Sequence, residues 1–520
     1  MKFSTFTQLM LLVLLLSSCH TSQPILNNDQ EALRYHYRVD LTALDEDKLT
    51  IVLDIEGLVP EQLTFCLPKI VPGIYGAMDF GQYVSNLSAR DKKGNPLRVQ
   101  QLDTNCWSIG QAYELKQITY QIDDSWEEFG RNNTKGFYRS SACSFRDSTF
   151  VLNSNCLFGY FRGYTQEPVE VVFEKPASLY GASSLEKAGG STRQDSFRAP
   201  SYHDLLDQPI LYAQPDTSLI RLPNIEVEVA CFSTSGEKIA EEIAAFIEPL
   251  LVNQTKYLGD KLPVDKYTFL IYHHSDPGQD FYMGDGLEHS NSTLILLYMP
   301  LDRQVIKETV YSIASHEFFH ILMPLGLHSH EIEDYDYNAP TFSQHLWLYE
   351  GMTEYFTIHM PIKTGVQSQE AFCKVIERKI KEMESFDPSL SLTALSKAPM
   401  EKQDQYYNVY LKGALLNLCL DIRLRELSKG EFGVQNLVEQ LIQKYGPDRP
   451  FEDEDLFDEI IKLTGFAELG PFFQQYVIGS KPLPLEVSLE KAGFSLQDGQ
   501  VKTLKNPTPQ QLELRQQWLK

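Results

Sequence analysis

The chain has 520 residues, which is too long for a single hydrophobic core and indicates about two to four domains. Its composition, 42% hydrophobic and 22% charged, is that of an ordinary folded protein. The formal net charge of −24 would repel a polyanion, so nucleic acid is not expected as a partner.

Residues 1–18 are typical of an export signal. Lys2 precedes an apolar run over 9–16 that is too short to span a bilayer in a mature chain. Cys19 follows two serines and resembles the lipobox cysteine of bacterial lipoproteins, which becomes the lipidated first residue. We therefore expect an exported protein, periplasmic or at the cell surface, with a lipid anchor to the bacterial membrane through Cys19 and a polar tether over 19–33. The alternative is an ordinary signal peptide cleaved near a chance cysteine.

The remaining cysteines are scattered and form no CxxC pair, which argues against a cysteine zinc site. Export permits disulfides, and Cys143 with Cys156 is one candidate pair. Cys231 and Cys419 lie in apolar runs and are expected in the core.

Period-two alternation over 35–41 and 49–55 predicts half-buried strands. Turn signals and many aromatic residues follow as far as about residue 222, without a long amphipathic helix. Residues 34–222 are therefore expected to form an all-β, sandwich-like domain.

The pattern changes after Pro223. Apolar runs predict strands over 225–231, 267–272 and 292–297, and helical spacing marks residues 239–250 and 306–322. From residue 363 onward the sequence predicts helices, one of them over 413–427 and another with an apolar stripe over 434–445. The fold class is therefore multidomain α+β, with an α+β domain over 223–362 and an α-helical domain over 363–520.

The predicted helix 306–322 carries the motif HEFFH. His316 and His320 stand one turn apart on one face, so both imidazoles can reach one metal ion. Glu317 lies beside the first histidine and can reach a metal-bound water. This arrangement is typical of zinc peptidases, in which the ion acidifies a water and the glutamate takes its proton.

A catalytic zinc needs a third protein ligand. A histidine six residues after His320 is excluded, because that position is Gly326. Glu350 lies in an apolar helix, where a carboxylate is costly unless it meets a cation or a metal. Glu354, one turn further on, could share that face or orient a ligand histidine instead. Candidates in a polar, loop-like stretch also stay open: His328, His330, Glu331, Glu333, Asp334, Asp336 and His345.

HEFFH followed by WLYEGMTEYF at 347–356 resembles the gluzincin clan, and most closely its glycyl-aminopeptidase family of metallopeptidases. The aminopeptidase N family is more distantly similar. The resemblance implies a thermolysin-like catalytic domain, one Zn²⁺ and Glu350 as its third ligand. Pro72-Gly73-Ile74-Tyr75 also resembles a motif of this family's N-terminal domain.

Two further segments resemble the same family. Residues 284–289 (GDGLEH) are similar to its Gly-Gly-Leu-Glu-His, which implies that Gly286 and Glu288 bind the substrate backbone and its amino terminus. Asp285 departs from the small residue usual there. Tyr410, before Lys-Gly-Ala, corresponds to a tyrosine that hydrogen-bonds the oxyanion, with Tyr406 and Tyr407 as close competitors. A surface acid and a helix-start aromatic are the alternative interpretations of Glu288 and Tyr410.

Members of that family often end in a PDZ domain. Only a short tail follows residue 493, so none is expected here. The sequence therefore predicts a zinc metallopeptidase that acts on peptides, an aminopeptidase favouring small glycyl or alanyl N-terminal residues. An endopeptidase with the same zinc site, a non-catalytic surface lipoprotein that binds peptides or glycans, and a zinc hydrolase of another bond are the alternatives.

Overall fold

The computed structural model describes residues 33–57, 59–126, 138–146, 148–278 and 283–520. The predicted signal peptide, Cys19 and the tether up to residue 32 lie outside these ranges. Within them, no helix combines the length and the apolar character that crossing a bilayer requires.

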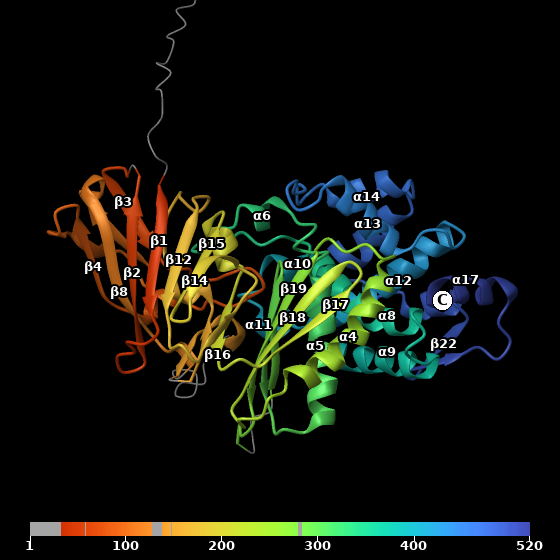
Figure 1. The fold of residues 1–520 in the computed structure, drawn as a ribbon. Coiled ribbons are helices and arrows are strands. Elements are labelled where there is room, and N and C mark those ends of the chain that lie inside the picture. Colours follow the sequence, from red (N-terminus) through yellow and green to blue (C-terminus); the bar gives the residue numbers. More distant parts are fainter. Residues whose placement is uncertain (1–32, 58, 127–137, 147, 279–282) are drawn as a thin grey trace, which may run out of the picture.

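Three regions lie side by side, as Figure 1 shows. A strand-rich region, red to yellow, holds the N-terminal part of the chain. A yellow-green sheet with its helices lies in the middle, and green-to-blue helices form the other end. The expected multidomain α+β architecture is confirmed.

The N-terminal region contains an eight-stranded sheet and two smaller sheets. In spatial order, the large sheet is β14 (Glu186–Ser191), β15 (Gln194–Ala199), β12 (Val169–Glu174), β1 (Arg34–Asp40), β2 (Lys48–Glu56), β8 (Leu115–Asp123), β4 (Val84–Asp91) and β5 (Pro96–Leu97). The second is β11 (Tyr160–Phe161), β3 (Gln62–Cys66), β7 (Cys106–Gly110) and β6 (Val99–Gln101). The third is β13 (Tyr180–Ala182), β16 (Ile210–Ala213), β10 (Thr149–Leu152) and β9 (Ser144–Arg146).

The helices described in this region are short, as the sequence predicts: η1 (Phe80–Tyr83), η2 (Ala112–Glu114), η3 (Arg139–Ser141), α2 (Ser154–Leu157) and α3 (Tyr202–Leu206). Alternate residues of β1 and β2 are buried, and they contribute to a core shared by the sheets. The period-two pattern therefore marks the face of each strand that packs inward.

The central sheet has five strands in the order β17 (Thr217–Leu222), β18 (Ile225–Ser233), β19 (Lys266–His274), β21 (Ser292–Tyr298) and β20 (Met283–His289). Strands β18, β19 and β21 are parallel, and β20 runs antiparallel at the edge. Since β17 pairs with β18 through a hairpin at Pro223, this sheet begins before the domain boundary predicted at residue 223.

Both faces of the central sheet are covered. Ile295 and Leu297 share a core with α4 (Ala240–Tyr257) and α5 (Arg303–Phe319), whereas Leu294 and Leu296 belong to the core of the N-terminal region. Burial on both faces explains why β19 and β21 read as continuous apolar runs rather than as alternating strands.

Helices make up most of the remaining chain: α6 (His330–Glu333), α7 (Leu346–Tyr349), α8 (Gly351–Lys363), α9 (Gln369–Met383), α10 (Leu392–Lys397), α11 (Gln403–Tyr406), α12 (Asn408–Leu427), α13 (Val434–Lys444), α14 (Leu456–Thr464), α15 (Leu469–Phe473), η4 (Gln474–Ile478), α16 (Leu485–Lys491) and α17 (Pro509–Leu519). A hairpin of β22 (Phe494–Gln497) and β23 (Gln500–Thr503) interrupts the helical pattern expected for the C-terminal region.

The disulfide joins Cys66 to Cys106, whereas the predicted partners Cys143 and Cys156 are free, buried thiols. Cys66 ends β3 and lies directly opposite Cys106, the first residue of β7. This pairing depends on strand register across 40 residues of sequence, which spacing alone does not reveal. Cys231 and Cys419 are buried, as expected.

Candidate active site

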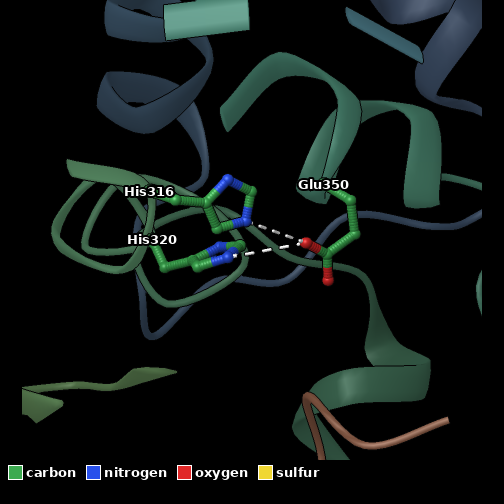
Figure 2. Close-up of side chains that lie close together, drawn as sticks. All are labelled: His316, His320 and Glu350. Atoms are coloured by element: carbon green, nitrogen blue, oxygen red, sulfur yellow. Dashed lines mark ion pairs between the residues drawn. The ribbon is translucent and has the colours of Figure 1, made fainter. Parts of the chain in front are cut away.

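Helix α5 presents His316 and His320 toward one carboxylate. It ends at Phe319, but His320 keeps helical backbone angles, so the two imidazoles still share one face. The helix stops earlier than predicted because Pro324 has no N–H to donate to the His320 carbonyl, which instead accepts from the N–H of Leu325. The Nε2 atoms of the two histidines lie 3.4 and 3.5 Å from Oε2 of Glu350 (Figure 2).

The other ring nitrogens are already engaged. Nδ1 of His316 donates to Glu354 at 2.9 Å, and Nδ1 of His320 donates to the backbone oxygen of Met323 at 2.9 Å. Each Nε2 lone pair is thereby left facing the centre. Burial raises the pKa of Glu354, but Lys379 and His316 outweigh it and lower that pKa to about 2, so Glu354 is ionised when it orients His316.

Glu350 interrupts the helix predicted over 347–356: it is the junction between α7 and α8. Its Oε1 accepts from the Tyr75 hydroxyl, whereas its Oε2 is buried and has no hydrogen-bond partner among the residues that the structure describes. A buried carboxylate oxygen without a donor is costly unless a cation occupies the space in front of it.

The donor set fits zinc. Two imidazoles and one carboxylate form a common catalytic zinc set, and tetrahedral ligation at 2.0–2.1 Å separates ligand atoms by about 3.3–3.4 Å. The ligand atoms of His316, His320 and Glu350 all lie within 4.8 Å of one another, and the two separations to Glu350 match that spacing. His316, His320 and Glu350 could therefore hold one zinc ion.

Glu317 is buried next to this cluster. Burial raises its pKa well above the usual range, the neighbouring carboxylate of Glu288 raises it further, and His316 opposes both. Gly286 makes room for Glu317, since a Cβ at residue 286 would lie 2.8 Å from Oε1 of Glu317 and 2.6 Å from Ile313. The glycine lets β20 approach α5 closely and places the Glu317 carboxylate over the strand.

Glu288 faces the same space from strand β20. Its carboxylate forms a second group with Glu317 and His320, whose ligand atoms also lie within 4.8 Å of one another. Strand β20 is hydrogen-bonded to β21 and is the edge strand of the sheet, which is the position at which an extended peptide adds to a sheet. Asp285, the departure from the family pattern, lies on the opposite face of the strand beside Ser140 and burial raises its pKa.

Tyr410 reaches the cluster from the first turn of α12. Its ring centroid lies 5.6 Å from that of His316, and its hydroxyl is 2.6 Å from that of Tyr406. The third competitor, Tyr407, has 55% of its surface exposed. Tyr410 and Tyr406 are therefore the tyrosines of α11 and α12 that lie at the site.

The other candidate ligands lie elsewhere. His328 contacts Pro324 and Glu333, and His345 is 2.7 Å from the backbone oxygen of Asp453. Across the described ranges, the groups of side chains with metal-binding spacing are the two that contain His320, and neither includes a residue of the 328–345 stretch.

Two residues at the site were not assigned from the sequence. Tyr75 bonds Glu350, and Lys379 holds Glu354. Tyr75 lies in the Pro72–Tyr75 motif noted for its family resemblance, but a contact across 275 residues of sequence leaves no local signal. Lys379 lies on an amphipathic helix, where a lysine is normally solvated.

Solved structures share this fold. An aminopeptidase N family protein from Idiomarina loihiensis is 22% identical, with a TM-score of 0.76 over 89% of this chain and 79% of that one. A mutant M1 zinc metallopeptidase from Deinococcus radiodurans, bound to a Tyr-Ser-Ala substrate, is 15% identical, with a TM-score of 0.54 over 88% and 96%. No curated protein matches. These matches show that the chain shares the fold of these proteins.

Two family models match the chain directly. The M61 peptidase N-terminal domain matches residues 36–214, and the M61 glycyl aminopeptidase model matches residues 309–416, which include the two histidines, Glu350 and Tyr410. Together they span more than half of the sequence. The chain belongs to the M61 glycyl aminopeptidase family.

Proposed function

We propose that this protein is a zinc-dependent aminopeptidase that removes small N-terminal residues, glycyl or alanyl, from peptides. The observation that carries the zinc site is the buried Oε2 of Glu350, which has no hydrogen-bond partner in the described part of the chain and faces Nε2 of both His316 and His320. The family assignment supports the aminopeptidase activity, and the preference for small residues rests on the family name alone.

A zinc ion held by His316, His320 and Glu350 would acidify a water and polarise the carbonyl of the scissile bond. Glu317 lies close enough to this centre to accept the proton of the attacking water and to deliver it to the leaving amine. Its raised pKa suits a carboxyl group that must hold that proton between the two steps. Tyr410 donates its hydroxyl proton as a hydrogen bond to the negative charge that develops on the carbonyl oxygen.

Glu288 supplies the exopeptidase element of the proposal. The substrate backbone would lie along the free edge of β20, and its terminal ammonium would meet the carboxylate of Glu288. Burial raises the pKa of Glu288, His320 opposes this shift, and the nearby carboxylate of Glu350 adds to it. An incoming ammonium would favour the ionised form of this carboxyl group. A free amino terminus is the group that fits this position.

The test combines zinc content with turnover on glycyl, alanyl and leucyl nitroanilides, on their N-acetylated forms and on internally quenched peptides. We expect one zinc per chain and cleavage of the unblocked substrates. Glu317→Gln should keep the zinc and lower kcat by about 10²- to 10⁴-fold. Glu308→Gln, an exposed acid on the same helix, is the matched control and should leave kcat unchanged.

Each alternative has its own outcome. Cleavage of blocked or internal bonds alone would replace the aminopeptidase with an endopeptidase. A chain without zinc, in which Glu317→Gln changes no activity, would be a non-catalytic binding protein. A protein that binds zinc and hydrolyses another class of bond, but cleaves no peptide, would be a different zinc hydrolase.

We also propose that the mature protein is an exported lipoprotein anchored through Cys19. The short apolar run after Lys2 and the two serines before Cys19 support this, and the Cys66–Cys106 disulfide is compatible with an oxidising compartment. In cells fed a clickable palmitate analogue, the full chain should be labelled and membrane-bound, and Cys19→Ala should lose both properties. An unlabelled wild-type protein would contradict the anchor.

A further inference from the structure

The N-terminal region reaches into the metal cluster through one turn, residues 72–75. The hydroxyl of Tyr75 donates to Oε1 of Glu350 at 2.8 Å, in a fully buried contact between residues 275 positions apart. No other hydrogen bond to that carboxylate oxygen is present within the described residues. The N-terminal region thus contacts the predicted third zinc ligand directly.

We propose that Tyr75 is a positioning residue for the third zinc ligand, so that the N-terminal β region completes the metal site. The inference rests on the zinc site proposed above. A carboxylate has two equivalent oxygens and can rotate about its terminal bond. A donor fixed on Oε1 leaves Oε2 as the oxygen that faces the two imidazoles, and such outer partners orient ligands and tune metal affinity.

Tyr75 is itself held from the opposite side. Its ring lies 4.6 Å, centroid to centroid, from the ring of Tyr406, and Nε2 of Gln403 donates to its backbone oxygen at 3.4 Å. Both contacts come from α11, just before the helix that carries Tyr410. Tyr75 is therefore clamped between α11 and Glu350 and cannot turn away without losing a buried contact.

The same turn also closes on the carboxylate proposed to bind the substrate amine. Gly73 has a φ of 79°, and a Cβ there would lie 2.8 Å from both oxygens of Glu288. A side chain at residue 73 would be strained by the backbone and would also displace Glu288. One turn therefore contacts two carboxylates of the site, Glu350 through Tyr75 and Glu288 through Gly73.

The experiment measures the zinc affinity of Tyr75→Phe by competition with a chromophoric chelator, and the visible spectrum of the Co²⁺-substituted protein. We expect zinc to bind about 10- to 100-fold more weakly and the Co²⁺ bands to shift, because the carboxylate is no longer fixed. Tyr202→Phe is the matched control. It removes a buried hydroxyl of the same region that donates to the Phe158 carbonyl at 2.7 Å, and should leave affinity and spectrum unchanged.

A second variant separates positioning from general destabilisation. In a Glu350→Ala background, Tyr75→Phe should change zinc affinity less than twofold, because Tyr75 acts only through that carboxylate. The inference is overturned if Tyr75→Phe binds zinc as tightly as the wild type with the same Co²⁺ spectrum, or if Tyr202→Phe weakens zinc equally. A wild-type chain that binds no zinc would instead defeat the proposed function.

Discussion

Tyr406 and Tyr410 share a short hydrogen bond beside His316, and their roles can be separated. The two hydroxyls lie 2.6 Å apart, and the Tyr410 ring packs 5.6 Å from the His316 ring, centroid to centroid. If Tyr406 donates to the Tyr410 oxygen, the Tyr410 proton is free to be donated to the substrate. Tyr406 would then orient the donor, and Tyr410 would be the donor itself.

We predict that Tyr410→Phe lowers kcat by about 10²- to 10³-fold with little change in KM, the loss typical of a missing oxyanion donor. Tyr406→Phe should cost about tenfold or less, because the Tyr410 proton is retained. Steady-state kinetics on the best nitroanilide substrate, at matched zinc content, give both values. The assignment would be reversed if Tyr406→Phe were the more damaging substitution.

Some residues of the candidate site could be predicted from the sequence, and others could not. His316, Glu317 and His320 follow from helical spacing. Glu350 is one of several acids that the residues alone leave open, and the family resemblance singles it out. The structure brings these side chains together. The sequence left three tyrosines open, because only tertiary packing exposes Tyr407 and buries the other two hydroxyls.

At the scale of elements, helices α8 and α12 touch backbone to backbone. A Cβ added to Gly413 would lie 2.7 Å from Cα of Gly351, the residue after Glu350. Tyr410 lies three residues before Gly413, on the first turn of α12. The glycine contact therefore sets how closely the carboxylate on one helix approaches the phenol on the other.

Gly413→Ala tests this contact, because the contact decides whether the substitution raises or lowers the free energy of unfolding. In an unobstructed helix the change stabilises by about 1 kcal/mol. Here overpacking should destabilise the fold by about 1–3 kcal/mol and lower kcat, because the helices are pushed apart. Gly470→Ala, whose Cβ would meet only Ile461 at 3.5 Å, is the control and should not destabilise. Urea unfolding measures both, and a stabilised Gly413→Ala would contradict the argument.

Helix α8 also carries a buried histidine that couples it to the C-terminal helix α17. Nε2 of His359 donates to the Trp518 carbonyl at 2.9 Å, and its Nδ1 accepts from Tyr257 at 2.8 Å. Burial lowers the pKa of His359 to about 4. The unfolded chain therefore binds a proton between about pH 6.5 and 4 that the folded chain does not, so stability is complete above pH 6.5 and falls as pH decreases through this window.

From pH 7 to pH 5, the wild type should lose about 2 kcal/mol through this one group. His359→Gln keeps a polar side chain but cannot titrate. Between pH 7 and pH 5, the variant should therefore lose about 2 kcal/mol less unfolding free energy than the wild type loses. Urea unfolding of both proteins at the two pH values gives the difference. Equal losses would show that folding does not lower the pKa of His359.

Elements also show where sequence patterns stop being informative. Strands β1 and β2 and helices α4, α5 and α13 follow from periodicity, because each buries one face. Strands β19 and β21 follow instead from continuous apolar runs, because both of their faces are buried. The hairpin of β22 and β23 does not, since a single two-stranded ribbon packed on α9 and α16 has no periodic signature of its own. The break at Glu350 is likewise invisible in an apolar run.

For the whole molecule, the central sheet connects two cores. Successive residues of β21 point alternately into the core of the N-terminal region and into the core of the helices. The N-terminal region therefore covers one face of the sheet that carries Glu288, and its turn over 72–75 reaches Glu350. The site is assembled from every region, so its integrity depends on the β region as well as on the catalytic helices.

The Cys66–Cys106 disulfide stabilises that β region, and its removal is a test at this scale. The bridge closes 40 residues of chain between β3 and β7, and a loop of this size corresponds to about 4 kcal/mol in the chain-entropy model. The turn over 72–75 lies inside the closed segment. Loss of the bridge should therefore lower unfolding stability, and the zinc site should be lost in the same transition as the β region unfolds.

We predict that the double variant Cys66→Ser, Cys106→Ser unfolds at a lower urea concentration, because its unfolding free energy is lower by about 4 kcal/mol. Reductant should produce the same loss in the wild type. Cys373→Ser, which removes a free, buried thiol and leaves the Cys66–Cys106 bridge in place, is the control. Because that control retains the bridge, its reduced and oxidised forms should differ as much as those of the wild type, whereas the double variant should show no difference. A double variant that still responds to reductant would place the stabilising bridge elsewhere in the chain.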